Sequence, residues 1–411
     1  MEVKPGYKQT EVGVIPEEWG CPRVREAASK ASHSIVGGPF GSDLVSADYV
    51  DTGTPVIRGQ NMGSTFVSGD FVFVSGKKAR ALSANLARAE DIIFTQRGTL
   101  GQVSIVPHGS FENYLISQSQ MKLSLDRARH DPRFVHHYFL SLPGQKQIVT
   151  SAIQTGVPHT NLGILRTYRF PAPTLPEQRA IATALSDVDG LLGGLDRLIA
   201  KKRDLKQAAM QQLLTGQTRL PGFHGEWEVK RLGDITHIKT GSQNNEDKVE
   251  DAQYPFFVRS EFVERINSYS HDCEAILVPG EGRIGDIFHY IKGRFNVHQR
   301  VYAITKFSPC ISGRFIHFYL SKNFGAWAMQ NTVKATVDSL RLPTFLTFEM
   351  RLPPTKAEQT AIAAVLSDMD AELAALTQRR DKTRALKQAM MQELLTGRTR
   401  LIPISTTEVK P

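Results

Sequence analysis

Apolar residues recur every seven positions, in alternating steps of four and three, in two segments of the chain. The apolar positions are Ile181, Leu185, Val188, Leu192, Leu195 and Ile199 in the first segment, and Ile362, Leu366, Met369, Leu373 and Leu376 in the second. This spacing predicts two long helices that pair through these residues as a coiled coil. Thr174 and Thr355, each followed by glutamate three residues later, match the capping box of a helix start. Gly216 and Gly397 match the glycine cap of a helix end.

The two helical segments are copies of one another. Residues 173–220 and 354–401 align without a gap, and more than half of the aligned residues are identical. A repeat of this length divides the chain into two halves, each a variable block followed by the shared segment. The predicted organisation is a first block at 1–172, a helical spacer at 173–217, a second block at 218–353, a second spacer at 354–398 and a C-terminal tail at 399–411.

Charges along the predicted helices favour antiparallel pairing. In both copies, acidic residues occupy the first half of the segment and basic residues the second half. An antiparallel pair sets opposite charges against each other, although the helix dipole alone would explain the same order. The alternative, in which each helix packs only on its own block, is disfavoured by the length of the seven-residue pattern. The tail sequence TRLIP (399–403) resembles TRLPG (218–222), which suggests that the N-terminal segment completes the second half in space.

Both variable blocks combine short strand-like runs with helical segments. In the first block the pattern predicts strands at 71–76, 91–95, 103–106 and 114–125, and a helix over 131–152. In the second block the runs FFVRS, AILVP, DIFHYI and RVYAIT predict strands. The expected fold class is α/β (α+β). Two globular blocks, each with a curved sheet, are expected in a pseudo-twofold arrangement and separated by two long antiparallel helices.

Composition narrows the class of protein. The chain has 411 residues and a net charge of +9, and its pI near 9.4 favours a polyanionic partner. The three cysteines, Cys21, Cys273 and Cys310, show neither metal-site nor disulfide spacing, so a cytoplasmic location is expected. No apolar run approaches the ~18 residues that a membrane helix needs, so no membrane association is expected.

Glycine-rich loops in both blocks carry side chains suited to reading base edges. Arginine pairs with guanine, and asparagine or glutamine pairs with adenine. The loops at 36–43, 97–101 and 281–285 do not match a phosphate loop. The candidates for DNA contact are Phe40, Ser42, Arg58, Gln60, Asn61, Arg97, Thr99, Gln118, Gln120, Lys239, Gln243, Asn244, Asn245, Arg259, Arg283, Gln299 and Arg300. Taken alone, each of them is better explained as an ordinary surface residue.

The sequence carries no recognisable catalytic motif. The [DN]PP[YF] motif of adenine methylation is absent, and DPRF at 131–134 is better explained as a helix start. Residues 228–230 are better explained as a strand than as the end of a nuclease motif. His136, His137 and His317 lie on predicted helices, where packing is a better explanation than metal binding. We therefore predict no catalytic, cofactor or metal site, although a dispersed active site would leave no such motif.

The repeated openings TxxEQxxIA and endings LKQxxMQxLLTGxTRL resemble those of the specificity subunits of type I restriction–modification systems. The segments GYKQTEVGVIPEEW (6–19) and TRLPGFHGEW (218–227) are also similar to that family. The resemblance extends over essentially the whole chain. It implies that the two blocks are target-recognition domains, each reading one half of a split, asymmetric site in double-stranded DNA. The helices would act as a ruler between the two halves.

The resemblance also implies partner subunits. Two modification subunits would dock on the helices and form an adenine methyltransferase that uses S-adenosylmethionine. Restriction subunits, acting as a translocase and nuclease with ATP and magnesium, would join the full complex. These cofactors would belong to the partners. Two other hypotheses stay open, namely an adaptor that recruits proteins without binding DNA, and an enzyme with a dispersed site.

Overall fold

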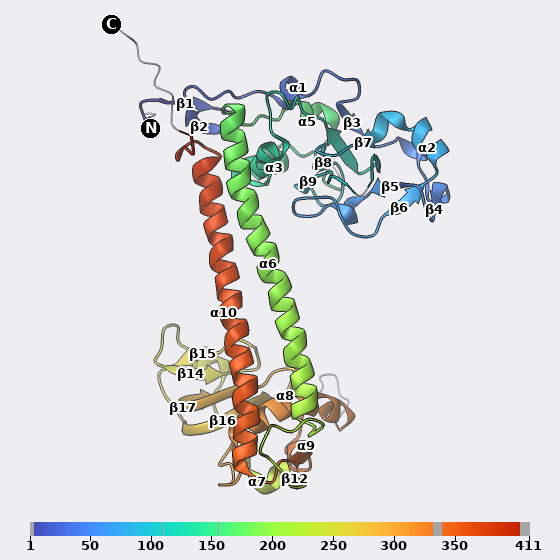
Figure 1. Cartoon of the computed structure of the whole chain (residues 1–411). Coiled ribbons are helices and arrows are strands. Elements are labelled where there is room, and N and C mark those ends of the chain that lie inside the picture. Colours follow the sequence, from blue (N-terminus) through green and yellow to red (C-terminus); the bar gives the residue numbers. More distant parts are fainter. Residues whose placement is uncertain (1–3, 110, 155, 332–338, 403–411) are drawn as a thin grey trace. The chain divides into compact units, whose positions relative to one another are not determined.

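Two units make up the fold. The computed structural model describes residues 4–109, 111–154, 156–331 and 339–402. Unit 1 comprises Met1–Leu195 and Arg379–Pro411, and unit 2 comprises Asp196–Gln378. The long helices α6 (Leu175–Leu213) and α10 (Lys356–Leu394) have 39 residues each (Figure 1). Each unit therefore contains one variable block and part of both helices, and the two predicted long helices are confirmed.

Unit 1 contains a hairpin and two larger sheets among its described residues. Its strands are β1 (Tyr7–Thr10), β2 (Gly13–Pro16), β3 (Ile35–Gly37), β4 (Tyr49–Val50), β5 (Thr54–Ile57), β6 (Val72–Val74), β7 (Leu86–Ala87), β8 (Ile92–Thr95), β9 (Val103–Ile105), β10 (Tyr114–Ile116) and β11 (Gln120–Leu123). Its shorter helices are α1 (Val24–Ala27), α2 (Gly76–Ala81), α3 (Pro132–Leu140), α4 (Leu142–Thr150) and α5 (Leu162–Thr167). The strand orders are β4-β6-β5-β10-β7 and β3-β11-β8-β9, and β1 pairs with β2. Only the β5–β10 pairing among these described strands is parallel.

Unit 2 repeats this plan with one large sheet. Its strands are β12 (Glu228–Arg231), β13 (His237–Thr240), β14 (Tyr254–Phe257), β15 (Glu264–Ile266), β16 (His271–Pro279), β17 (His289–Val297), β18 (Val301–Thr305) and β19 (Glu349–Leu352). Its shorter helices are α7 (Leu232–Ile235), α8 (Gly313–Gln330) and α9 (Leu342–Leu346). The sheet order is β13-β18-β16-β17-β14-β15, with β14 and β17 parallel, and β12 pairs with β19. Mixed sheets with segregated helices agree with the predicted α/β (α+β) class.

Two predicted elements are each divided in the structure. The run 114–125 forms β10 and β11 with a turn between them, because the amide of Gln120 bonds the carbonyl of Ser117 (3.0 Å) and reverses the chain. The predicted helix over 131–152 breaks at Ser141, which ends α3 and caps α4 by accepting from the Gly144 amide. The predictions of one continuous strand over 114–125 and one continuous helix over 131–152 were therefore wrong. The start of α3 was predicted correctly, since Asp131 caps it.

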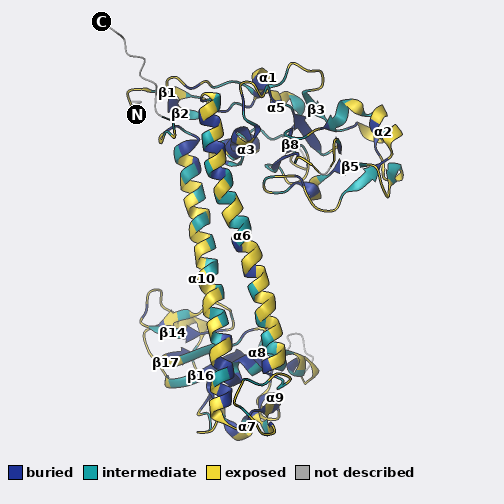
Figure 2. Cartoon of the chain, in the orientation of Figure 1, coloured by how far each residue is buried: buried dark blue, intermediate teal, exposed yellow. Residues whose placement is uncertain are grey.

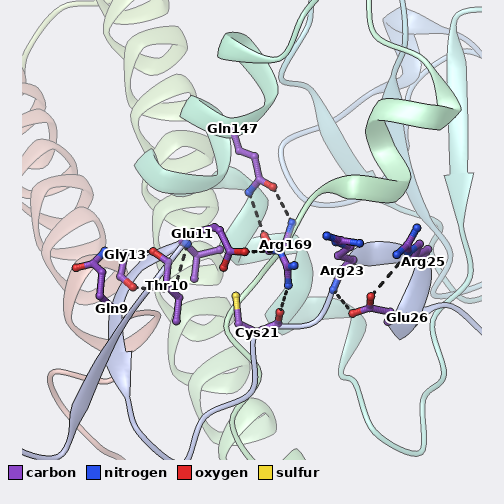
Figure 3. A network of polar contacts seen from close by, with 11 residues as sticks. Gln9, Thr10, Glu11, Gly13, Cys21, Arg23, Arg25, Glu26, Gln147 and Arg169 are labelled. Atoms are coloured by element: carbon purple, nitrogen blue, oxygen red, sulfur yellow. Dashed lines mark hydrogen bonds and ion pairs between the residues drawn. The ribbon is translucent and has the colours of Figure 1, made fainter.

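The N-terminal segment packs within unit 1 beside the end of α10. Tyr7 donates from its hydroxyl to the carbonyl of Gly397 at 3.0 Å. On the other side, Arg169 donates to the carbonyl of Cys21 at 2.8 Å and lies 3.3 Å from the carboxylate of Glu11 (Figure 3). Gln147 holds the Arg169 backbone through two hydrogen bonds. The expectation that the N-terminal segment completes the second half in space is confirmed within this unit.

The long helices run antiparallel in both units. In unit 1 the carboxylate of Asp189 lies 2.6 Å from the Lys387 ammonium. Glu177, earlier in α6, accepts a hydrogen bond at 2.8 Å from Arg400, which follows α10. In unit 2, Lys202 lies 2.6 Å from Glu372, and Lys206 pairs with Asp370. Moving forward along α6 therefore means moving backward along α10 in each unit. The antiparallel pairing predicted from charge is confirmed.

The predicted apolar seam is buried or half-buried throughout. The buried members are Ile181, Leu185, Leu195, Ile199, Ile362 and Leu366, and the half-buried members are Val188, Leu192, Met369, Leu373 and Leu376. Figure 2 shows that exposed residues cover much of the middle of both helices. At the ends, however, Ile181 shares a core with Phe139 of the first block and Leu394 of α10. The helices thus pack on their own blocks as well as on each other.

Histidines on α3 and α8 belong to the cores. The Nε2 atom of His136 lies 3.1 Å from the carbonyl oxygen of Val103, and the Nε2 atom of His317 lies 3.1 Å from the carbonyl oxygen of Phe288. Burial lowers the pKa of both imidazoles to about 4. Burial, followed by the charges of its neighbours, lowers the pKa of His137 to about 2. The predicted role of these histidines in helix packing is confirmed.

Candidate nucleic-acid interface

Four loops meet at one edge of unit 1, where β3, β5, β8 and β10 end. The amide of Ser117 bonds the carbonyl of Ile57 (3.0 Å), and the amide of Gln96 bonds the carbonyl of Ser119 (2.6 Å). Gly38 lies so close that a Cβ there would be 1.9 Å from the Ser117 carbonyl oxygen, which only glycine avoids. We call this set of loops, 38–44, 58–61, 96–101 and 117–119, the loop edge of unit 1.

Unit 2 has a loop edge built by equivalent backbone hydrogen bonds. It consists of the loops 241–247, 258–261, 280–286 and 298–300, which follow β13, β14, β16 and β17. The amide of His298 bonds the carbonyl of Phe257 (3.0 Å), and the amide of Gly280 bonds the carbonyl of Arg300 (2.8 Å). A Cβ on Gly241 would lie 1.9 Å from the Val297 carbonyl oxygen. The two loop edges share one backbone plan.

This shared plan aligns the side chains of the two edges. The equivalent pairs, written unit 1 first, are Arg58 and Val258, Arg97 and Glu281, Thr99 and Arg283, Gln118 and Gln299, and Ser119 and Arg300. One pair keeps the same residue type, whereas four change charge. The same scaffold therefore presents two different chemical surfaces.

Most of the sequence-predicted candidates lie on these loop edges, but two are buried. Asn61 is 1% exposed; its amide donates to the carbonyls of Ser68 (3.1 Å) and Asp70 (3.0 Å). Gln120 is fully buried and hydrogen-bonds with the side chain of Ser117. These two side chains hold loops in place instead of facing outward. Polar residue type alone, read from sequence, did not reveal their burial.

The remaining candidates are at least partly accessible. Phe40 is 88% exposed, and Gln118 reaches back to donate to the carbonyl of Gly41 (2.6 Å). In unit 2, Gln299 donates to the side chain of Asn244, so these two amides are already paired. The other half-buried or exposed candidates are Ser42, Arg58, Gln60, Arg97, Thr99, Lys239, Gln243, Asn245, Arg259, Arg283 and Arg300. Lys239 lies on β13, and the others lie on the loop edges. Contact of any of them with DNA stays a prediction.

The arginines of the two edges differ in their electrostatic partners. Glu281 lies between Arg259 and Arg300, at 3.3 Å from each guanidinium. Arg283 pairs with Glu261 at 2.7 Å and with Asp286 at 3.4 Å. Among the described residues of unit 1, neither Arg58 nor Arg97 forms an ion pair within 4.0 Å, and the Nε atom of Arg58 has no hydrogen-bond partner.

A buried histidine contacts the charged cluster of unit 2. His298 is 4% exposed, and its Nδ1 accepts from the backbone amide of Arg300 at 3.0 Å. Burial, then the charges of Arg259 and Arg300, lower the pKa of His298. The ring is therefore neutral near pH 7, with its proton on Nε2, and adds no charge to the loop edge.

Sequence reasoning missed Glu281. Its carboxylate only accepts hydrogen bonds, whereas arginine, asparagine and glutamine were the residue types expected to read base edges. The similarity of IIFTQRGTLG (92–101) to AILVPGEGRIG (275–285) was nevertheless visible in the sequence. Aligning those glycines places Arg97 opposite Glu281 and would have marked the position.

Among the described residues, no cluster of three or more histidine, cysteine, aspartate or glutamate side chains is arranged to hold a metal ion. Within the same residues, no helix is both long and apolar enough to cross a membrane.

Comparison with known proteins matches both halves of the chain to one family. Residues 46–199 and 224–384 match the family described as "Type I restriction modification DNA specificity domain". The chain is 29% identical over 171 residues to the type I restriction enzyme EcoDI specificity subunit of Escherichia coli, covering 42% of this chain and 37% of that protein. It is 22% identical over 438 residues to the putative type I restriction enzyme MjaX specificity subunit of Methanocaldococcus jannaschii, covering 96% and 97%.

A solved structure has a similar fold. The crystal structure of the type I restriction–modification system S subunit from M. genitalium matches with a TM-score of 0.65 at 15% sequence identity. The match covers 96% of this chain and 98% of that chain.

Proposed function

Since the chain belongs to the family of type I restriction modification DNA specificity domains and carries two of them, we propose that each block reads one half of a bipartite, asymmetric site in double-stranded DNA. The observation that carries this proposal is the pair of loop edges. They share their backbone hydrogen bonds but differ in side-chain charge at four of five aligned positions. A common scaffold with different base-reading groups is what two different half-sites require.

The helices would set the spacing between half-sites. Their antiparallel pairing in each unit supports this role, because paired helices are stiffer than a flexible linker. Two modification subunits would dock on the helices, and restriction subunits would join them.

Catalysis would belong to the partners. The chain lacks the [DN]PP[YF] motif of adenine methylation, and the family is defined by DNA specificity. The modification subunits would supply S-adenosylmethionine chemistry, and the restriction subunits would use ATP and magnesium. Methyl transfer by this chain alone, measured with labelled S-adenosylmethionine, would contradict this assignment.

Methylome sequencing of cells that express the chain with its modification subunit tests the proposal. We expect one split motif with two unlike halves. Replacing residues 221–353 with the block of a relative should change one half only, and inserting one heptad in both helices should lengthen the spacer. Scattered methylation without a motif would contradict specificity. Binding by the chain that is insensitive to salt would favour the adaptor hypothesis, because contacts with DNA phosphates release counterions and weaken as salt is added.

A further inference from the structure

Glu281 lies between two arginines on the loop edge of unit 2. Its carboxylate is 3.3 Å from a guanidinium nitrogen of Arg259 and 3.3 Å from one of Arg300. The side chain of Glu281 is 24% exposed, whereas those of Arg259 and Arg300 are 46% and 58% exposed. The acid is thus the inner member of the cluster, and both bases extend outward from it.

The backbone holds Glu281 firmly at this place. Gly280, immediately before it, donates its amide to the carbonyl of Arg300 (2.8 Å) and accepts from the amide of Leu340 (2.8 Å). Glu281 itself forms an antiparallel bridge with Ser339. A Cβ at Gly280 would lie 2.9 Å from the Tyr302 ring, so the chain passes too closely there for a larger residue. The carboxylate is therefore attached to a fixed strand end and not to a free loop tip.

A carboxylate in this position restricts both arginines without using all their donors. Each guanidinium has five N–H groups in a rigid fork, and only part of that fork is needed for the contact with Glu281. The remaining N–H groups can still make the two parallel bonds that guanine accepts at O6 and N7. Ordering the arginines before binding lowers the entropy lost on binding.

We propose that Glu281 is a positioning residue that fixes Arg259 and Arg300 to read guanine in the half-site of unit 2; this inference rests on the proposed function. The carboxylate also disfavours close approach of phosphates, so it directs the two arginines toward base edges instead of the DNA backbone. Unit 1 has Arg97 at the equivalent position, so its half-site is read without this device.

The test uses the full chain with its modification subunit and a set of duplexes. Each duplex carries one base change in the half-site assigned to unit 2. With Glu281→Gln, we expect discrimination against the changed base to fall about 10-fold at a G·C pair, with discrimination in the other half-site unchanged. The salt dependence of binding should become steeper by about one phosphate contact, because the released arginines can reach phosphates.

Asp272→Asn is the matched control. It also converts one carboxylate to an amide in an ion pair of unit 2, since Asp272 lies 3.0 Å from Arg294, but this pair lies within β16 and β17 and not on the loop edge. Its motif and salt dependence should match those of the unchanged chain. A second variant, Arg300→Lys, keeps the charge but loses the fork, and should relax the same G·C pair.

Several outcomes would overturn the proposal. Unchanged discrimination in Glu281→Gln, relaxation of both half-sites together, or an unchanged chain whose second half-site has no invariant guanine would each do so. A loss in Asp272→Asn as large as that in Glu281→Gln would show a general structural effect, and it would also overturn the proposal. Absence of any motif for the unchanged chain would instead remove the proposed function, which distinguishes the two failures.

Discussion

Units 1 and 2 build the junction between block and helices from the same side chains, whereas they place different side chains on their loop edges. At the junction of unit 1, Glu177 is 1% exposed and receives a hydrogen bond from Arg400 (2.8 Å). At that of unit 2, Glu358 is fully buried and receives one from Arg219 (2.6 Å). The junction is the repeated part of the molecule, and the loop edge is the variable part.

Each junction also contains a tryptophan and a glutamine. Arg400 lies 5.5 Å from the ring of Trp19, and Arg219 lies 5.9 Å from the ring of Trp227. The glutamine that follows each buried glutamate accepts from a backbone amide at the start of α3 or α8, at 2.8 and 2.9 Å respectively. In unit 1 the tryptophan comes from the N-terminal segment, so the two ends of the sequence together supply what unit 2 takes from one continuous stretch.

The difference between the junctions and the loop edges shows which contacts the fold requires in both units. A buried carboxylate needs its partner in every copy, because an unpaired buried charge is costly. The loop edge needs its backbone bonds, its close-packed glycines and the buried side chain of Asn61, whereas most of its other side chains are accessible. Variation in what is read is thus compatible with one fold.

The largest expected effect comes from breaking a junction. Arg400→Ala should destabilise unit 1, and Arg219→Ala should destabilise unit 2, each by about 3–5 kcal/mol, because each leaves a buried glutamate without its cation. Hydrogen exchange, followed separately in the two units, measures the loss. Glu177→Gln is the control, and its loss should be smaller because the amide carries no charge. A loss in only one of the two arginine variants would show that the junctions are not equivalent.

The repeated parts of the molecule could be predicted from sequence because their signals are local. The seven-residue spacing predicted α6 and α10, and their charge order predicted the antiparallel direction. The predicted role of the capping-box glutamates was less complete. Thr355 does accept from the amide of Glu358 (3.3 Å), but the carboxylates of Glu177 and Glu358 bind arginines more than a hundred residues away. Helix-start patterns cannot show such a distant partner.

The loop edges were only partly predictable. The glycine-rich loops and most candidate side chains were found, since glycine marks turns and close approaches. Burial of Asn61 depends on carbonyls of Ser68 and Asp70 that face it only after the chain folds. The role of Glu281 depends on two arginines from other loops. Contacts between loops are set by the sheet, which the local sequence does not specify.

The second-largest expected effect is the loss of folding stability at acidic pH, which should differ between the cores of the two units. His137 of unit 1 is 1% exposed at the position where unit 2 has Phe318. Because burial holds the pKa of His137 at about 2, the folded state stays unprotonated while the unfolded state binds a proton below about pH 6.5. Stability from this residue is therefore complete above about pH 6.5 and is lost as the pH falls toward 2.

His137→Phe should remove this loss. We compare the free energy of unfolding of the variant with that of the unchanged chain at each pH. This difference should be about 2 kcal/mol more favourable to the variant at pH 5 than at pH 8. Urea unfolding at the two pH values measures the difference. The reverse exchange in unit 2, Phe318→His, should introduce the same sensitivity there. Equal pH dependence in the unchanged chain and His137→Phe would mean that the pKa of His137 is the same in the folded and unfolded states.

The smallest effect concerns an ion pair that unit 2 has and unit 1 lacks. Lys202 pairs with Glu372 at 2.6 Å, and their side chains are 31% and 46% exposed. The aligned residues of the other copy are Thr383 and Leu191, which cannot form this pair. A double-mutant cycle with Lys202→Ala and Glu372→Ala should give a coupling of about 0.2–1 kcal/mol, decreasing with added salt. The more buried pair of Lys387 and Asp189, which has its counterpart in unit 2, is the comparison and should show the larger coupling. If the exposed pair gave an equally large coupling energy, exposed ion pairs would stabilise the antiparallel helix pairing as much as the more buried pairs that occur in both units.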